Sequence, residues 1–194
     1  LRNPELAAVL QRMAQEGPDA LMTGDVARAI THAVQHHPAH PGTLSLQDLT
    51  DYRPLVREPL CIDYTAAREY RLCGMPPPSS GMLAIGQILG LLNHTSAATL
   101  ALHNGMPSAD WLHLYTEASR LAFADRAYYV ADPAFTKAPG GDWQSLLAPT
   151  YLAERAKGID ASPSGQSTRN PPAGKPGSLP LAYGPSPEQP EYGT

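Results

Sequence analysis

Four histidines in the segment HAVQHHPAH are the first residues whose spacing could support chemistry: His32, His36, His37 and His40. His32 and His36 stand four positions apart, which places two imidazoles on one face of a helix, as zinc sites require. No HExxH pattern and no cluster of cysteines or carboxylates accompanies them. A polar helix end, where histidine is favoured by the negative end of the helix dipole, explains them more simply. We therefore predict no metal site and no cofactor.

Two serines, Ser79 and Ser80, follow the proline run of MPPPSSG and could suggest a nucleophile. They lack the G-x-S-x-G pattern that exposes a nucleophilic serine at a strand-to-helix turn. Either serine can instead cap the apolar helix that begins at Gly81, because a serine hydroxyl accepts a hydrogen bond from the first helical turn. We predict this capping role.

Acidic and basic side chains share one long predicted helix. Glu117 and Arg120 can pair at i, i+3, which is usually a solvated surface contact. Asp125 differs from them, because it lies on the apolar face, four residues after Leu121, where a carboxylate needs a partner. For Asp125 we predict a structural salt bridge or a cap on another segment in preference to catalysis.

Helices must position most of these residues. Apolar residues at helical spacing, together with capping signals, predict helices over 4–17, 25–36, 45–52, 81–93, 108–130 and 149–158. Between them, the segments REPLCIDY and REYRLCGM carry β-prone residues on either side of TAA and predict a hairpin. The predicted fold class is α+β, predominantly helical with one β-hairpin.

The end of the chain has a different composition. Residues 160–194 hold eight prolines and five glycines and show no apolar periodicity. Such a segment cannot offset its ordering entropy by burial, so we expect it to be extended, loosely attached or disordered. We divide the chain into a region 1–158 and a Pro/Gly-rich tail 159–194.

Overall composition excludes some classes of partner. The chain has 194 residues and a net charge of −4 with no block of like charges, which argues against a nucleic-acid surface or an anionic-membrane patch. The longest apolar run, GMLAIGQILGLL, is too short to span a bilayer and predicts a buried helix.

Two cysteines, Cys61 and Cys73, fall on the two strands of the predicted hairpin. A cross-strand disulfide in an oxidising compartment and a pair of buried thiols both fit this placement. No signal peptide is present, although a mature or truncated chain could have lost one. The compartment therefore stays open at this point.

Several segments, taken in order, resemble the γ-glutamyltranspeptidase family. They are NPELAAVLQRMAQEGPDALMTGDVARAI, LSLQDLTDY, MPPPSSG and EASRLAFADRAYYVADPAF. Each segment alone is weak, but their order and spacing across roughly Asn3 to Arg155 make the resemblance specific. It covers only the C-terminal part of the family's large subunit. The segment HHPAHPGTLS departs from the family's usual glycine pair, a loop change that need not affect catalysis.

The resemblance implies an N-terminal nucleophile hydrolase, in which this chain forms part of an αββα sandwich. The family's precursor cuts itself ahead of a threonine, at a junction that commonly reads Gly-Thr-Thr-His or Gly-Thr-Ser-His. This chain ends EYGT. By resemblance, Gly193 is the last residue of the large subunit and Thr194 is the autocleavage residue and the catalytic nucleophile.

The implied reaction is cleavage of γ-glutamyl amides such as glutathione. A threonine hydroxyl needs a base, and the α-amine freed by cleavage, with a pKa of about 8, can serve. The acyl-enzyme would pass its acyl group to water or to an acceptor amine. In the family the substrate-binding residues lie outside this segment, so those of this chain are unknown and the fragment alone is expected to be inactive.

The resemblance also implies partners and a compartment. The small subunit of the same precursor is the expected partner, a homodimer is a further expectation, and the family is periplasmic or secreted. The competing hypothesis is a non-enzymatic helical interaction module that presents its proline-rich tail to a partner groove. The tail segment NPPAGKPG lacks a clean PxxP motif, which weakens that alternative.

Overall fold

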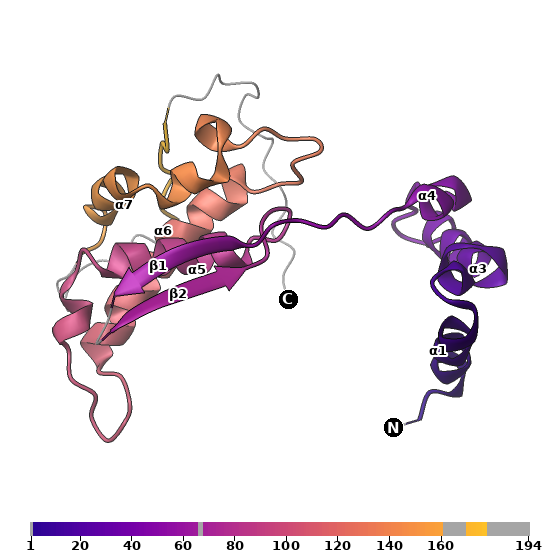
Figure 1. Cartoon of the computed structure of the whole chain (residues 1–194), viewed down its shortest axis with the longest axis horizontal. Coiled ribbons are helices and arrows are strands. Elements are labelled where there is room, and N and C mark those ends of the chain that lie inside the picture. The colour runs from indigo at the N-terminus through magenta and orange to yellow at the C-terminus, as the bar shows by residue number, and fades with distance from the viewer. Residues whose placement is uncertain (1, 66–67, 161–169, 178–194) are drawn as a thin grey trace. The chain divides into compact units, whose positions relative to one another are not determined.

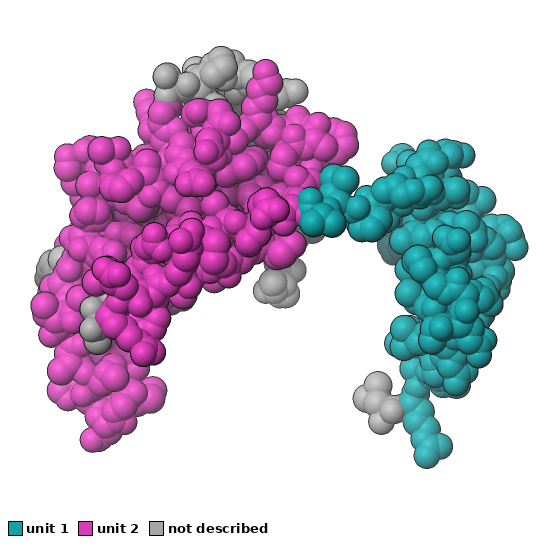
Figure 2. Space-filling model, viewed as in Figure 1, with its two compact units in different colours: residues 1–56 teal, residues 57–194 magenta. Residues whose placement is uncertain are grey.

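The structure, a computed structural model, describes residues 2–65, 68–160 and 170–177. The chain divides into two compact units, residues 1–56 and residues 57–194 (Figure 2). Its described residues are mostly helical with one two-stranded sheet (Figure 1), which confirms the predicted mixture of helices and a hairpin. The αββα sandwich that the resemblance implies stays a prediction.

The first unit contains four helices: α1 (Pro4–Glu16), α2 (Asp19–Met22), α3 (Gly24–Gln35) and α4 (Leu46–Asp51). Asn3 caps α1, and its Oδ1 accepts a hydrogen bond of 3.0 Å from the N–H of Leu6. A capping box begins α4, in which Ser45 and Asp48 each accept a backbone hydrogen bond from the other. Local sequence signals are therefore sufficient to begin both helices.

Little of the first unit is buried. Within its described residues the buried side chains are Ala20, Ala27 and Thr31. The apolar stripe of α1 packs incompletely, since Leu6 and Leu10 are each about half exposed and α1 contributes no buried residue. This unit therefore has a much smaller core than the second unit.

The second unit begins with the predicted hairpin, which consists of β1 (Leu60–Thr65) and β2 (Glu69–Gly74). The strands are antiparallel, with Leu60 opposite Gly74 and Thr65 opposite Glu69. Leu60, Ile62 and Leu72 point to one face and pack against α5 and the 3-10 helix Trp143–Leu147. Because side chains alternate along a strand, the opposite face carries the cysteines and the charged residues.

Helix α5 (Gly81–Leu92) lies between the hairpin and the later helices of the second unit (Figure 1). Eight of its residues are buried, which confirms the predicted buried helix. Two glycines allow close packing on it. A Cβ at Gly90 would lie 2.5 Å from Leu152 of α7, and one at Gly86 would lie 2.8 Å from Leu147.

The main core forms where α5 packs against α6 (Ala109–Tyr129) and α7 (Pro149–Ala156). Short 3-10 helices, Ser96–Thr99, Pro139–Gly141 and Trp143–Leu147, connect these elements. The buried side chains of this core are Ile88, Leu91, Leu92, Ala97, Leu114, Ala118, Leu121, Ala122, Leu152 and Ala156. None of the described helices is long and apolar enough to cross a lipid bilayer.

Two local predictions were wrong. Ser80 occupies the position before α5 but does not cap it, because its backbone is already in the helical region (φ −95°, ψ −8°), whereas a capping serine needs an extended backbone. Within the tail, the described residues 170–177 are also better attached than expected. Pro176 is fully buried, and residues 170–177 make hydrogen bonds to α6 and α7. The predicted boundary between residues 158 and 159 stays a prediction.

Candidate functional site

The most concentrated polar chemistry in the described chain surrounds Asp125 of α6. Its side chain is completely buried, on the face of α6 that packs against α5 and α7. A buried carboxylate is stable only when its lone pairs are satisfied and its charge is compensated. Three different segments supply the groups that do this.

One carboxylate oxygen of Asp125, Oδ2, accepts hydrogen bonds from helices α5 and α7. Gln87 of α5 donates through Nε2 at 2.9 Å, and Tyr151 of α7 donates through its hydroxyl in a short hydrogen bond. Arg155, one turn after Tyr151, adds an ion pair of 3.0 Å to Oδ1 and a longer contact from Nε to Oδ2. This pairing confirms the predicted structural salt bridge.

The other oxygen, Oδ1, also binds the C-terminal segment 170–177. The backbone N–H of Gly174 donates to it at 2.7 Å. Two neighbouring side chains hold the same segment, because Arg155 donates to the carbonyl of Pro172 at 2.6 Å and Tyr129 donates to the carbonyl of Gly174 at 2.6 Å. Asp125 therefore links α5, α6, α7 and the segment 170–177.

The two tyrosines beside Asp125 are held as neutral donors. Burial raises the pKa of Tyr151, and the hydrogen bond to Asp125 and the charge of that carboxylate raise it further. Burial and then the same charge raise the pKa of Tyr129. Both shifts favour the protonated form, in which each hydroxyl donates its hydrogen bond.

This arrangement suits anchoring and does not suit catalysis. Both oxygens of Asp125 are occupied, and the side chain has no access to solvent or to a substrate. In the described residues, no buried side-chain nitrogen or oxygen lacks a hydrogen-bond partner. The sequence-based preference for a structural role of Asp125 is therefore confirmed.

The predicted autocleavage residues, Gly193 and Thr194, lie outside the described residues, and so does the predicted nucleophile, which is Thr194. The autocleavage and nucleophile assignments therefore stay predictions.

Other candidate residues behave as ordinary structural groups. The rings of His32 and His36 stack with centroids 4.1 Å apart, and the Nδ1–H of His36 donates to the carbonyl of His32. No group of three metal-binding side chains occurs in the described part of the chain. Ser80 accepts a hydrogen bond of 2.7 Å from Nε of Arg126, so it connects the start of α5 to the end of α6.

The predicted pair of Glu117 and Arg120 forms at 3.1 Å, but it is not a solvated surface contact. The side chain of Glu117 is only 5% exposed, whereas that of Arg120 is 34% exposed. The expectation of a surface pair was wrong because helix packing buries this face of α6, which the helical period alone does not show.

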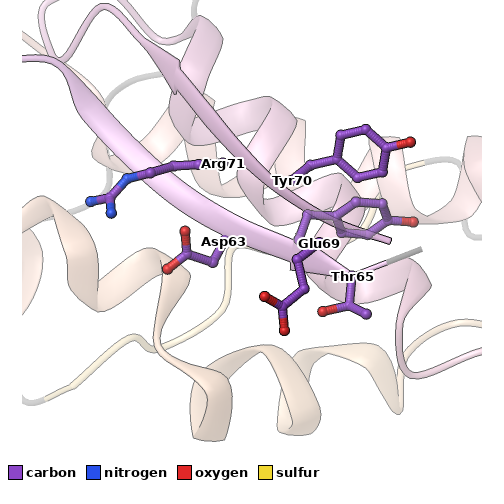
Figure 3. Close-up of a pocket in the computed structure, with 6 residues that line it drawn as sticks. Asp63, Thr65, Glu69, Tyr70 and Arg71 are labelled. Atoms are coloured by element: carbon purple, nitrogen blue, oxygen red, sulfur yellow. The ribbon is translucent and has the colours of Figure 1, made fainter. Parts of the chain in front are cut away.

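Both strands of the hairpin line a shallow hollow of about 420 Å³ (Figure 3), and four of its six lining residues lie on the face that points away from α5. Its lining includes Asp63, Thr65, Glu69 and Arg71, all exposed. Asp63 stands opposite Arg71 in the strand register, so opposite charges face each other across the pair. The hollow has no buried titratable group, and it therefore ranks below the Asp125 centre as a candidate site.

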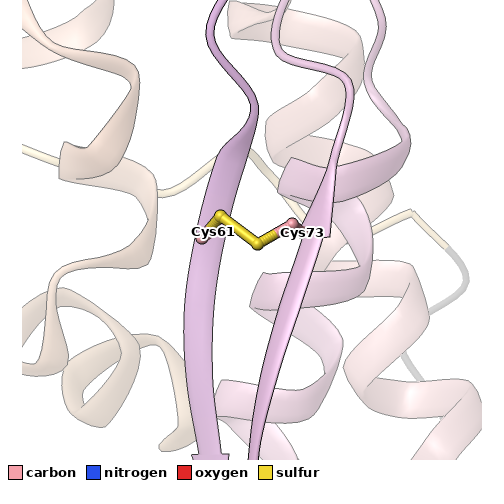
Figure 4. Close-up of a disulfide and its surroundings, with 2 residues drawn as sticks. All are labelled: Cys61 and Cys73. Carbon is pink, nitrogen blue, oxygen red and sulfur yellow. A yellow bond between two sulfur atoms is a disulfide. The ribbon is translucent and has the colours of Figure 1, made fainter.

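On the same face, Cys61 and Cys73 are bonded as a disulfide across the two strands (Figure 4). They are directly opposite each other in the register, with Cα atoms 4.1 Å apart. Of the two alternatives that the sequence left open, the structure has the disulfide.

Sequence reasoning identified Asp125 but missed its partners. Tyr151 and Arg155 carried one usable signal, because their spacing of four puts two polar side chains on one face of a short helix. Gly174 carried none, since it lies in a proline-rich segment without periodicity.

Comparison with known proteins adds to this geometry. The family model described as gamma-glutamyltranspeptidase matches residues 1–191. The acylase ACY 1 proenzyme of Pseudomonas sp. (strain SE83) is 42% identical over 151 residues, which are 78% of this chain and 25% of that protein. The glutathione hydrolase proenzyme of Escherichia coli (strain K12) is 36% identical over 164 residues, 83% of this chain and 26% of that protein.

Solved structures agree with these matches. The gamma-glutamyltranspeptidase from Pseudomonas nitroreducens complexed with L-DON aligns with a TM-score of 0.69 and 31% identity, over 89% of this chain and 48% of that chain. Cephalosporin acylase from Bacillus halodurans aligns with a TM-score of 0.61 and 28% identity, over 79% of this chain and 26% of that chain. The chain spans about a quarter of the length of the curated relatives it matches.

Proposed function

Since this chain belongs to the gamma-glutamyltranspeptidase family, we propose that it is the C-terminal part of the large subunit of a γ-glutamyltransferase or hydrolase precursor. The whole protein would cleave γ-glutamyl amides such as glutathione. The observation that carries this proposal is the family match over residues 1–191. The next residues include Gly193 and Thr194, the first two residues of the self-cleavage junction that the family resemblance implies.

In this proposal Thr194 acts twice. Its hydroxyl first attacks the carbonyl of Gly193, and the amide bond between Gly193 and Thr194 breaks, which frees the α-amine and leaves an ester. Water then hydrolyses the ester, which releases the carboxylate of Gly193 and restores the hydroxyl of Thr194. That amine then serves as the base for the same hydroxyl, which attacks the γ-carbonyl of the substrate and expels the amine product. Water or an acceptor amine releases the acyl group. The names of the relatives support a processed precursor, since several are proenzymes.

The small subunit of the same precursor is the proposed partner. Large apolar side chains remain exposed on the described helices of the second unit, among them Ile85, Leu112 and Phe123, each about half exposed. The first unit similarly leaves the apolar stripe of α1 uncovered. Packing against the rest of the precursor, or a homodimer, would cover such surfaces.

We also propose that this chain forms part of the αββα sandwich that the family resemblance implies.

We place the mature protein in the periplasm or outside the cell. The support on the chain itself is the disulfide between Cys61 and Cys73, because disulfides persist in oxidising compartments and are rare in the cytosol.

A second candidate function is an acylase for amides other than γ-glutamyl amides. The observation that favours it is the acylase relative, which is more similar (42%) than the glutathione hydrolase (36%). The purified enzyme can be assayed with a γ-glutamyl anilide and with a glutaryl anilide, which lacks only the α-amino group. Faster turnover of the γ-glutamyl anilide supports a γ-glutamyl enzyme, and the reverse order supports an acylase.

The nucleophile proposal is tested with the full-length precursor. Thr194→Ala should remain uncut, because no side-chain oxygen remains to form the ester. Thr194→Ser should cut more slowly and retain some turnover, because a hydroxyl and a freed α-amine both survive. Mass spectrometry of the small subunit gives the decisive measurement, since an N-terminal residue other than Thr194 would remove this threonine from the active site.

A further inference from the structure

The segment 170–177 is held by backbone contacts at three successive points. Arg155 binds the carbonyl of Pro172, Asp125 binds the N–H of Gly174, and Tyr129 binds the carbonyl of Gly174. Asp125 and Arg155 are charged, and both side chains are largely buried, with exposed fractions of 0% and 11%. Hydrogen bonds to charged groups are stronger than neutral ones, so this segment has a fixed position on the second unit.

The site also selects the residue that it holds. A Cβ at Gly174 would lie 2.2 Å from the hydroxyl oxygen of Tyr151 and 2.9 Å from Cδ of Arg155. Both atoms belong to side chains that are themselves bound to Asp125, so neither can move without breaking a buried hydrogen bond. Two positions later Pro176 is completely buried, and its carbonyl lies next to Gly140. The site therefore accepts glycine at position 174 and excludes larger residues.

The docked segment lies close in sequence to the predicted cleavage point. Sixteen residues, 178–193, separate Gly177 from Thr194. Among the described residues, the attachment before this segment is Asp160, whose carbonyl is hydrogen-bonded to His113 of α6, and 33 residues, 161–193, separate it from Thr194. Releasing the segment 170–177 would therefore double the length of chain between Thr194 and the last attachment that the described residues show.

We propose that Asp125, with Arg155 and Tyr129, is a positioning site that docks the segment 170–177 and so promotes self-cleavage between Gly193 and Thr194. This inference rests on the proposed function, because it assumes that cleavage. The entropic cost of positioning the end of a connection grows with the logarithm of its length, with a coefficient of 1.5 RT. Doubling the connection should therefore slow self-cleavage about threefold.

Two matched pairs of substitutions test this in the full-length precursor. Gly174→Ala puts a methyl group where no space exists, and Lys175→Ala, next to it on an exposed residue, is its control. Tyr129→Phe removes only the hydroxyl that binds Gly174, and Tyr128→Phe, at an exposed neighbour, is its control. Neither test variant removes Asp125 or Arg155, so both partners of the buried ion pair remain in the chain.

Two measurements are made on each variant. Hydrogen exchange of the peptide that contains residues 173–175, in precursors that also carry Thr194→Ala and stay uncut, reports docking without any enzyme activity. The rate at which the precursor band disappears, with Thr194 intact, reports self-cleavage. We expect faster exchange and about threefold slower cleavage in Gly174→Ala, smaller changes in the same direction in Tyr129→Phe, and wild-type behaviour in both controls.

The outcomes separate this inference from the function it rests on. Faster exchange in Gly174→Ala with cleavage at the wild-type rate would overturn the positioning role and leave the proposed function intact. Unchanged exchange in Gly174→Ala would also overturn the inference, because the segment would then dock without the close fit at Gly174. A wild-type precursor that never cuts itself, or that cuts at another bond, would instead refute the proposed function.

Discussion

Two leucines of helix α6 offer a sharp test of how this helix packs. Leu114 is 2% exposed and belongs to the main core, whereas Leu112, two positions earlier, is 49% exposed. Leu114→Ala and Leu112→Ala remove the same atoms from the same helix. Any difference between their effects on stability therefore reports burial, since helix propensity changes equally in both variants.

The expected magnitudes depend on the exposed fractions. At Leu114 the substitution forfeits a full transfer free energy and leaves a cavity between α5 and α6, which together cost about 3–4 kcal/mol. At Leu112 roughly half of the side chain is already in water and no cavity forms, so the cost should be about 1 kcal/mol or less. The expected difference is about 2–3 kcal/mol.

Urea unfolding followed by tryptophan fluorescence measures this difference. Both tryptophans, Trp111 and Trp143, lie in the second unit, so the signal reports that unit without interference from residues 1–56. With a denaturant slope of about 2 kcal/mol per molar urea, the midpoints of the two variants should differ by about 1 M.

Equal midpoints for the two variants would refute the assigned face of α6. The same pair can then be compared in the assembled precursor. If another part of the precursor covers Leu112, the cost of Leu112→Ala should rise toward that of Leu114→Ala, which would identify this face as an interface.

Four further predictions concern the disulfide, the pH dependence and the isolated chain. Reduction of the Cys61–Cys73 bridge, which spans a sequence separation of 12, should lower the free energy of unfolding by about 3 kcal/mol, and a double Cys→Ser variant should not respond to reductant. Hydrogen bonds from Ser45 lower the pKa of Asp48, so this carboxylate stabilises the fold above its ordinary pKa and loses that effect as the pH falls through the lowered value. Thermal unfolding should therefore show Asp48→Asn to be less stable than wild type near neutral pH, with the difference disappearing on acidification well below about pH 4; a constant difference would contradict the linkage. The isolated 194-residue chain should not turn over a γ-glutamyl anilide, and clear turnover would contradict the proposal that its remaining site residues lie elsewhere in the precursor. The isolated chain should also bind a hydrophobic dye and self-associate in light scattering, whereas a compact monomer that binds no dye would show that its exposed apolar side chains need no cover.

Short stretches of sequence are sufficient to encode the local elements of this protein. Asn3 begins α1 and the Ser45–Asp48 capping box begins α4, because each cap contacts an N–H within three positions of itself. The apolar run 81–92 predicted a buried helix, since its residues leave no polar face to place in water. Alternation in the two β-prone segments predicted the hairpin, and opposite positions in its register brought the two cysteines together. The order of the motifs predicted the family, which the family match confirms.

Which distant groups meet depends on tertiary packing. The need of Asp125 for a partner was visible in the helical period, but Arg155 lies 30 positions and Gly174 lies 49 positions further along the chain. The backbone conformation before α5 likewise turned Ser80 away from capping and toward Arg126, 46 positions away. Periodicity and capping act over one or two helical turns, and they contain no information about which helix faces pack together. The packing of α5, α6 and α7 brings these distant groups within hydrogen-bond range, and burial then requires them to pair.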